Sequence, residues 1–348
     1  MTRWRQRIGE EGAEALLKQT IETAVKTGQI KKSSFQRLNV DTTVQEKNIA
    51  FPTDAKLYDK AREKLVKAAR DRNISLRQSY ARVGKKALRM QSRYRHARQP
   101  RRARRELKKL KNFLGRILRD IRREAEKIDP ELEALLQLAE RLYEQKKGDK
   151  NKLYSLHEPE LECIAKGKAH KKYKFGCKAS YVSTSKDNWI VGAKALHGNP
   201  YDGHTLKEAL SQSEALTGWK AKQVYCDRGY RGQQLRELKE EGVEVTVTVK
   251  KRMSWWDLKW LKRRSAIEPV IGHLKLDNRL DRNYLKGTLG DKLNAVLSAC
   301  GFNLRKLLKA ACKAPPFLLL FWLQWIFLTF LRAFYCSSRE RRGLRFNL

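Results

Sequence analysis

The sequence lacks a cysteine framework, because no two of its six cysteines form a Cys-x-x-Cys pair. This spacing argues against a disulfide scaffold and against a zinc site, so free cytosolic thiols are expected. The amino terminus also lacks the apolar stretch of a signal peptide, since Met1-Thr-Arg-Trp-Arg leads into Gly9 and acidic residues. We therefore expect a cytoplasmic protein. The cysteines are Cys163, Cys177, Cys226, Cys300, Cys312 and Cys336.

Acidic residues are scarce relative to basic ones. The 348 residues include 77 Lys and Arg against 38 Asp and Glu, which gives a formal net charge of +39. So strong a positive field favours a polyanionic partner, so nucleic acid is expected and an anionic membrane is the weaker alternative. A hydrophobic fraction of 41% and an aromatic fraction of 9% indicate a folded protein and exclude a disordered basic tail.

Long hydrophobic runs are also rare. One stands out, FLLLFWLQWIFLTFL at 317–331, within an expected hydrophobic tail at 313–348. A membrane span needs about 20 apolar residues, and the run reaches that length only if it extends through Cys336. We expect it to dock on the protein or to form a dimer contact, with a membrane span as the weaker alternative.

The amino-terminal part predicts a helix followed by a strand. Residues 10–27 have an amphipathic helical pattern, within an expected helical remnant at 1–34. Residues 35–54 form the expected first strand segment, with a short strand that ends at Asp41. The alternative role for an aspartate at a strand end is an Asx turn.

Residues 55–150 differ in both pattern and charge. Leucines and isoleucines recur at 3-4-3-4 spacing from 107 to 121, and Asp129-Pro130 begins a second helix. We predict a large basic helical insertion here. Its arginine-rich run from 93 to 111 is either a solvated helix face or a surface that meets phosphate.

Residues 151–312 predict alternating strands and helices. Together with the first strand they predict an α/β fold, a mixed sheet with helices on its faces, interrupted after the first strand by the helical insertion. The predicted elements are strands at 171–183 and 189–196, a helix ending near 216, a strand at 223–226, a helix at 233–241, a strand at 243–250, a helix at 264–275 and a helix at 289–311.

One acid stands in the predicted helix at 264–275. Arg264, Glu268 and Lys275 share one helical face, and apolar residues at 267, 270, 271 and 274 form the neighbouring strip that docks on a core. The alternative is structural, since Ser265-x-x-Glu268 matches a capping box and Pro269 suits a first turn.

Three carboxylates thus come from separate elements: Asp41 and Asp227 at predicted strand ends, and Glu268 on a helix. Ligands bind beyond strand ends in such sheets. Oxygen ligands of this kind suit hard divalent cations, and two such ions can clamp the attacking and leaving oxygens of a phosphoryl transfer.

These residues lie in stretches that resemble the D-D-E transposases of bacterial insertion sequences, close to the insertion-sequence-five and insertion-sequence-four groups. The resemblance covers the chain from about 35 to 310. The stretches are NVDTTVQEKNIAFPTDAKL (39–57), HGNPYDGHTL (197–206), VYCDRGYRG (224–232), RRSAIEPVIGHLK (263–275) and NRLDRNYLKGTLGD (278–291).

The resemblance implies a ribonuclease-H-like fold in which Asp41, Asp227 and Glu268 are catalytic and bind two Mg²⁺ ions, for which Mn²⁺ substitutes. It implies that Arg264 and Lys275, from a tyrosine-arginine-glutamate-lysine signature, contact DNA at the element ends. Leu261 stands at the tyrosine position of that signature. Arg228 and Tyr230 are expected to line the same cleft and to bind DNA. Asp202 is a weaker candidate for the site, and a role in ordering its loop is favoured for it; a cap on the following helix is an alternative role for His204.

The implied reaction is metal-dependent cleavage of DNA at the element ends, followed by strand transfer into target DNA, carried out by a homodimer on DNA. Relatives generally carry a larger amino-terminal helical DNA-binding domain, so truncation is expected here. The alternatives are a catalytically inactive DNA-binding remnant and a nuclease without strand transfer.

Overall fold

The sheet is built around β1 (Arg37–Glu46), which carries the buried apolar residues Leu38, Val40 and Val44. In this computed structural model β1 pairs antiparallel with β3 (Tyr173–Thr184) on one side and parallel with β5 (Gln223–Tyr225) on the other. The structure describes residues 2–125, 128–146, 148–165, 172–247, 253–312 and 322–328.

Three further strands complete the sheet. β6 (Glu244–Thr246) extends it parallel to β5, and β2 (Glu162–Ala165) and β4 (Ile190–Leu196) both pair antiparallel with the far edge of β3. The sheet is therefore mixed, with the parallel pairs on one side of β1 and the antiparallel pairs on the other. This order is compatible with the ribonuclease-H-like domain that the resemblance implies.

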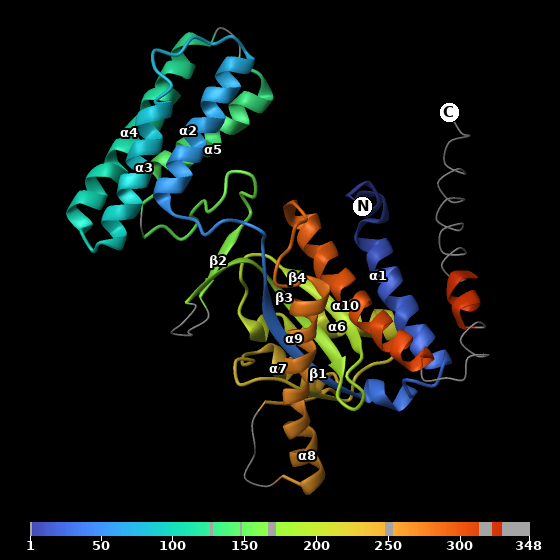
Figure 1. The fold of residues 1–348 in the computed structure, drawn as a ribbon. Coiled ribbons are helices and arrows are strands. Elements are labelled where there is room, and N and C mark those ends of the chain that lie inside the picture. Colours follow the sequence, from blue (N-terminus) through green and yellow to red (C-terminus); the bar gives the residue numbers. More distant parts are fainter. Residues whose placement is uncertain are drawn as a thin grey trace.

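The helices fall into two groups (Figure 1). One group surrounds the sheet, with α8 projecting away from it, and the other forms a separate bundle that follows β1 in the chain. The first group is α1 (Thr2–Lys26), α6 (Leu206–Thr217), α7 (Gln234–Glu240), α8 (Trp255–Arg263), α9 (Ile267–Asn278) and α10 (Gly287–Ala311). The bundle is α2 (Asp54–Asp71), α3 (Ala81–His96), α4 (Pro100–Glu124) and α5 (Pro130–Glu144).

Helices α10 and α6 cover opposite faces of the sheet. The Tyr181 hydroxyl donates to the carbonyl of Ala295 in α10 at 3.3 Å. Tyr181 and its neighbour Val182 point to opposite faces, because side chains alternate along a strand. A Cβ at Gly192, the cross-strand partner of Val182, would lie 3.1 Å from that valine and 3.5 Å from the Ala209 carbonyl in α6. The predicted helices on both faces are therefore present.

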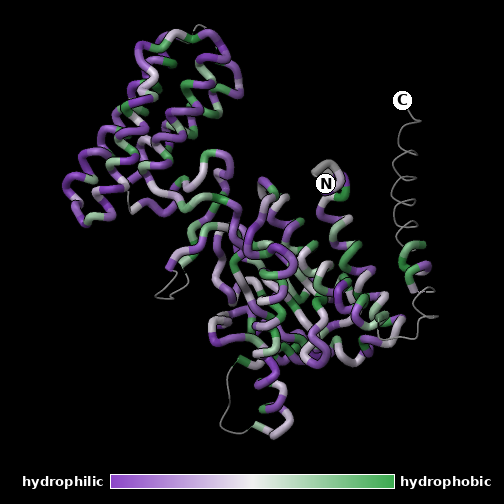
Figure 2. Tube along the Cα trace, in the orientation of Figure 1, coloured by the Kyte–Doolittle hydropathy of each residue, from purple (hydrophilic) through white to green (hydrophobic). Residues whose placement is uncertain are grey.

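The bundle has a hydrophobic core of its own. Leu110, Leu114, Ile117 and Ile121 of α4 are all buried at the predicted 3-4-3-4 spacing, against Leu132, Leu136, Ala139 and Leu142 of α5. This cluster is distinct from the larger one around the sheet. Figure 2 shows the same division, with spaced hydrophobic positions in an otherwise hydrophilic bundle and a more continuous apolar interior around the sheet.

Sequence and structure differ at several places, among them α8, which was not predicted. β1 extends five residues beyond Asp41, so the prediction of a strand ending there is wrong. β2 was not predicted, because four residues with burial varying from buried to exposed carry little pattern. The capping box at Ser265 is also wrong, since that hydroxyl donates to the Lys262 carbonyl and α9 has no side-chain cap. The predicted strand at 243–250 is seen at Glu244–Thr246, and its last three residues lie outside the described ones.

The hydrophobic run at 317–331 lies mostly outside the described residues, of which 322–328 are helical. Among the helices that the structure describes, none combines the length and apolar character needed to cross a bilayer.

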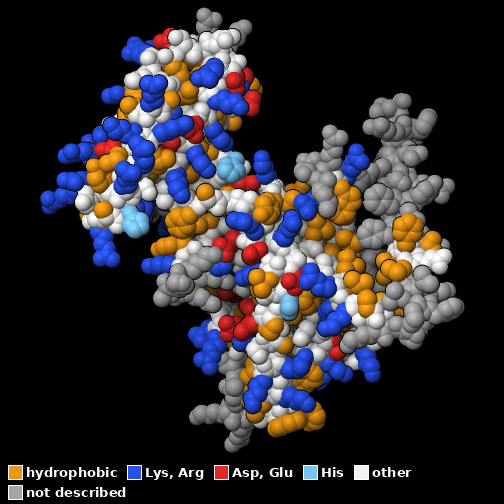
Figure 3. All heavy atoms as spheres, viewed as in Figure 1, with side chains coloured by type: hydrophobic (Ala, Val, Ile, Leu, Met, Phe, Trp, Pro, Cys, Tyr) orange, Lys and Arg blue, Asp and Glu red, His pale blue; other side chains and the backbone are white. Residues whose placement is uncertain are grey.

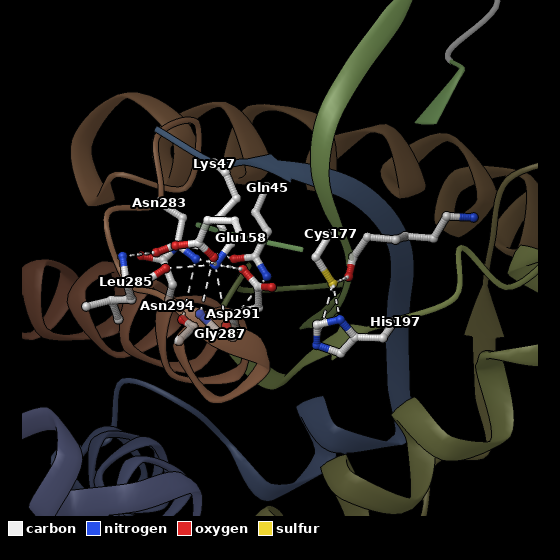
Figure 4. Close-up of polar contacts among 12 residues, drawn as sticks. Gln45, Lys47, Glu158, Cys177, His197, Asn283, Leu285, Gly287, Asp291 and Asn294 are labelled. Atoms are coloured by element: carbon white, nitrogen blue, oxygen red, sulfur yellow. Dashed lines mark hydrogen bonds and ion pairs between the residues drawn. The ribbon is translucent and has the colours of Figure 1, made fainter. Parts of the chain in front are cut away.

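A buried cation joins the end of β1 to α10 and to the segment before β2 (Figure 4). The Lys47 ammonium lies 3.0 Å from a Glu158 oxygen and 3.1 Å from an Asp291 oxygen, and the three side chains are at most 6% exposed. It also donates to the carbonyls of Leu285 and Gly287. One lysine thereby holds three separate parts of the chain.

Replacing Lys47 with methionine tests this arrangement. The substitution keeps the length of the side chain and leaves Glu158 and Asp291 buried without their cation, so the free energy of unfolding should fall by about 3–5 kcal/mol in urea titrations. Lys194→Met is the matched control, because Lys194 pairs with Glu208 at a half-exposed site and such pairs contribute below about 1 kcal/mol. Equal losses in the two variants would contradict the structural role of Lys47.

Candidate active site

Asp41 and Asp227 lie level with each other on adjacent strands. In the parallel pairing of β1 and β5, Asn39 stands opposite Tyr225. Asp41 and Asp227 each follow two residues later, and the ladder continues past β5, since the Cys226 amide donates to the Thr246 carbonyl of the next strand. Because neighbouring strands are about 4.8 Å apart and side chains repeat every second residue, the two carboxylates share one face.

Both aspartates are held by the same local contact. Each accepts a hydrogen bond from the amide of the following residue, Thr42 to Asp41 at 2.8 Å and Arg228 to Asp227 at 2.7 Å. The backbone thus orients both carboxylates in the same way.

Glu268 reaches the same place from a helix. One guanidinium nitrogen of Arg264 lies 4.0 Å from an Asp227 oxygen and 3.8 Å from a Glu268 oxygen. Since both acids are within 4.0 Å of a single nitrogen, they are close to each other. Their side chains are about 60% exposed, at 59% and 63%, while Arg264 is 21% exposed.

A set of polar contacts fixes this helix against β1. Asn39, on the same face of β1 as Asp41, donates to the Arg263 carbonyl at 3.3 Å and accepts from the Ser185 hydroxyl at 2.6 Å. Arg263 in turn donates to the Ser185 carbonyl at 2.7 Å. Asn39 is fully buried, so these bonds hold Arg264 and Glu268 beside the strand that carries Asp41.

The surroundings of Cys226 reflect the same arrangement of Asp41, Asp227 and Arg264. Burial raises the pKa of this thiol, and the carboxylates of Asp41 and Asp227 raise it further, whereas Arg264 opposes them. All three charged groups therefore act on one buried sulfur. Arg264 thus lies beside Asp227 and Glu268, while the ligand atoms of Asp41, Asp227 and Glu268 do not all lie within 4.8 Å of one another.

The loops around the site pack closely together. A Cβ at Gly203 would lie 1.9 Å from the Arg231 carbonyl, so only glycine allows the turn at 202–204 to approach the loop after β5. Asp202 accepts from the Thr42 hydroxyl at 2.8 Å and pairs with Lys178 at 3.1 Å. These contacts support the expected role of Asp202 in ordering its loop.

Two further expectations need correction. The Tyr230 side chain is 1% exposed, so in this structure it lies beneath the site and not on a surface that DNA could contact. Burial raises the pKa of its phenol well above the usual value, and Cys226, Asp41 and Asp202 raise it further. His204 forms no cap, because α6 begins at Leu206 without a side-chain cap and the His204 ring instead meets Tyr201 edge to face.

The remaining predicted residues lie near the carboxylates. Arg228 is exposed directly after Asp227, and Lys275 lies in the last turn of α9, about 10 Å along the axis from Glu268. The buried strip of α9 is as predicted, at Ile267, Val270, Ile271 and Leu274.

Sequence reasoning missed a second group of potential metal ligands. Ligand atoms of Cys177, His197 and Asp291 lie within 4.8 Å of one another (Figure 4). Burial raises the pKa of the Cys177 thiol, which donates to two carbonyls, and Asp291 is already bound by Lys47 and Asn283. Internal contacts therefore satisfy this group. No local spacing marks it, since its members are far apart in the chain.

The comparisons with known proteins concern the part of the chain that carries Asp227 and Glu268. Residues 151–297 match the family described as Transposase DDE domain. This match supports a DDE transposase, a polynucleotidyl-transferase type of enzyme whose substrate is DNA. Asp41 precedes the matched residues, so its place in the site rests on the pairing of β1 with β5.

A relative in Rhizobium meliloti, named "Uncharacterized protein ORF8 in nfe locus", is 54% identical over 99 residues. The similar segment is 28% of this chain and 48% of the relative, so the chain spans about half of that protein's length. No solved structure matches the chain.

Proposed function

We propose that the chain is a D-D-E transposase of an insertion sequence, in the insertion-sequence-five or insertion-sequence-four group, with Asp41, Asp227 and Glu268 as its catalytic residues. The observation that carries the proposal is the approach of Asp227 and Glu268 to one arginine, beside the strand position of Asp41. The match of residues 151–297 to a transposase domain is independent support.

The donor set fits hard divalent cations. Three carboxylates offer the oxygen ligands that Mg²⁺ prefers, two of them well exposed, and we propose that they hold two Mg²⁺ ions, which Mn²⁺ could replace. When bound, such ions activate the attacking oxygen and stabilise charge on the reacting phosphate. The arginine next to two acids also keeps the site from accumulating unpaired negative charge.

The basic residues supply contacts to DNA. Arg264 presents a guanidinium beside the carboxylates, where it can donate two hydrogen bonds to a phosphate. Arg228 and Lys275 extend the positive charge on either side of the acids. The proposed reaction is hydrolysis of a phosphodiester at the element end, followed by attack of the released 3′-hydroxyl on target DNA. The second step forms one phosphodiester for each one it breaks and needs no external energy source.

The helical bundle adds a second basic surface (Figure 3). α3 has six Lys and Arg residues and no carboxylate, and α4 has eleven against three. The three acids of α4 are all engaged in ion pairs, with Lys109 and Arg123. Most cations on these two helices therefore have no described carboxylate partner, as expected of a surface that binds DNA.

A cleavage assay tests the proposal. Asp227→Asn should reduce Mg²⁺-dependent cleavage of element-end DNA by about a thousandfold or more, because metal-assisted charge stabilisation contributes several kcal/mol. Binding of the same DNA should be retained.

Asp277→Asn is the matched control for that assay. Asp277 lies on α9 and pairs with Arg305 at 2.6 Å, away from the three acids, so cleavage should stay near the level of the unmodified chain. Cleavage that persists in Asp227→Asn would refute the assignment. If the unmodified chain bound the DNA and never nicked it, even with Mn²⁺, the inactive DNA-binding remnant would be the better description, and cleavage without joined products would indicate a nuclease.

Metal binding can be measured without DNA. Glu268→Gln and Asp227→Asn should each weaken binding of Mn²⁺, followed by water-proton relaxation, by at least about tenfold. Asp277→Asn should leave it unchanged. Equal Mn²⁺ affinity in all three variants would show that the acids do not form a metal site.

A further inference from the structure

A pocket of about 190 Å³ lies where the helical bundle meets the sheet. It is formed by the connection from β1 to α2, the first half of α2 and the segment before β2. Its lining includes Lys56, Lys60, Lys64 and His157, together with apolar residues such as Phe51 and Leu57.

Cations converge on this pocket from three parts of the chain. Lys56, Lys60 and Lys64 follow each other at intervals of four on α2, which places them on one helical face. The pKa of Lys64 is lowered by burial and then by Lys286 and Lys60. The pKa of His157 is lowered by burial and by Lys64, Lys60 and Lys286, against an opposing effect of Glu158. Lys286 therefore belongs to the same group.

These lysines are not neutralised within the described part of the chain. None of Lys56, Lys60, Lys64 and Lys286 forms an ion pair there, and all four are exposed to solvent. The nearby Glu158 is engaged by Lys47 at 3.0 Å, and Asp54 lies 3.8 Å from Lys152. Like charges gathered without a counterion repel each other, so the arrangement favours an anionic ligand.

Figure 4 shows the buried contacts of Lys47, which help to place Lys286 and His157. Lys47 donates to the carbonyls on both sides of Lys286, those of Leu285 and Gly287. Its partner Glu158 directly follows His157 and accepts from the Gly287 amide at 3.2 Å. The contacts of Lys47 and Glu158 thus fix the positions of Lys286 and His157, although Lys286 lies close to other lysines.

We propose that this pocket binds a phosphate of the DNA backbone, at a contact separate from the three carboxylates. The proposal rests on the proposed function for the identity of the polymer. At about 190 Å³ the pocket is smaller than the roughly 300–1,000 Å³ of sites that enclose small molecules. A single phosphate on a longer chain fits a site of this size that has three lysines along one side.

The position of the pocket suits one continuous duplex. Lys47 follows Asp41 by six residues along β1, a distance of about 20 Å at about 3.3 Å per residue. That distance corresponds to about six base pairs, since stacked nucleotides rise about 3.4 Å. A duplex of that length or more is therefore long enough to span the carboxylate site and the pocket.

Salt-dependent DNA binding tests this contact. The full chain with Lys64→Gln and Lys286→Gln is compared with the unmodified chain on a labelled 30-base-pair duplex in EDTA, where no cleavage occurs. Loss of the contact to one phosphate should reduce the slope of log affinity against log salt by about 0.9. Thermal unfolding followed by circular dichroism checks that both proteins are folded.

The matched control is Lys18→Gln with Lys239→Gln, which removes the same charge from exposed residues of α1 and α7. It should leave the slope unchanged. Equal changes in both double variants would indicate a general field effect and overturn the proposal.

Inorganic phosphate distinguishes the source of the ligand. If millimolar phosphate shifts the His157 ring proton resonances while the DNA slope of the lysine variant is unchanged, the pocket binds free phosphate and the DNA contact is wrong. Because binding is measured without metal, failure of the chain to cleave DNA would contradict the proposed function and leave this test intact.

Discussion

The parallel pairing of β1 with β5 is the constraint on which the candidate site depends. It joins residues separated by about 186 positions, as in the bond from Arg37 to the Gln223 side chain, and it aligns Asn39 with Tyr225. A shift of one residue would turn either aspartate to the opposite face of the sheet. The helical bundle, like much of the fold, lies between β1 and β5 in the chain. It must therefore fold without disturbing the three residue pairs that join β1 to β5.

The two ends of β1 use polar groups in different ways. Near its start, buried Asn39 connects the strand to the turn before α9 through neutral hydrogen bonds. At its end, Lys47 connects it to α10 and to the segment at 158 through charges. Burying two carboxylates costs several kcal/mol each unless they are paired, so this second connection is specific for lysine. Burial raises the pKa of Asp291 while Lys47 and Asn283 lower it, which shows the two effects in opposition.

Much of the site could be predicted because its parts carry local patterns. The buried strip of α9, with Glu268 on its exposed side, follows from a 3.6-residue period, and Asp227 follows a short apolar strand. The position of Asp41 within β1 could not be predicted. Thr42 and Thr43 look like the end of a strand, but they continue it because β3 pairs with β1 through Glu46.

Features that depend on contacts between residues far apart in the chain could not be predicted from the sequence. Tyr230 stands beside Asp227 in the sequence and looks available to a ligand, yet the loop folds its ring under the site against Thr42 and Asp202. Lys47, Glu158 and Asp291 gave no signal, because buried charges resemble exposed ones until their partners are known. Local spacing predicts faces of helices and strands, whereas the pairing of charges comes only from the fold.

The ion pairs of Lys47 with Glu158 and Asp291 also connect the stability of the fold to its positive surface. If Lys47 interacted only with Asp291, the segment carrying His157 would be free to separate from the loop carrying Lys286. Glu158 binds both Lys47 and the Gly287 amide. These buried, paired charges therefore fix the position of the exposed Lys286 next to them. The net charge of +39 is thus not spread evenly over the molecule. Buried carboxylates pair with lysine or arginine, as in Asp291 with Lys47 and Asp59 with Arg62, whereas the exposed lysines beside the bundle have no ion pair among the described residues. This division explains how a chain with so few acids can combine a stable interior with a surface suited to DNA.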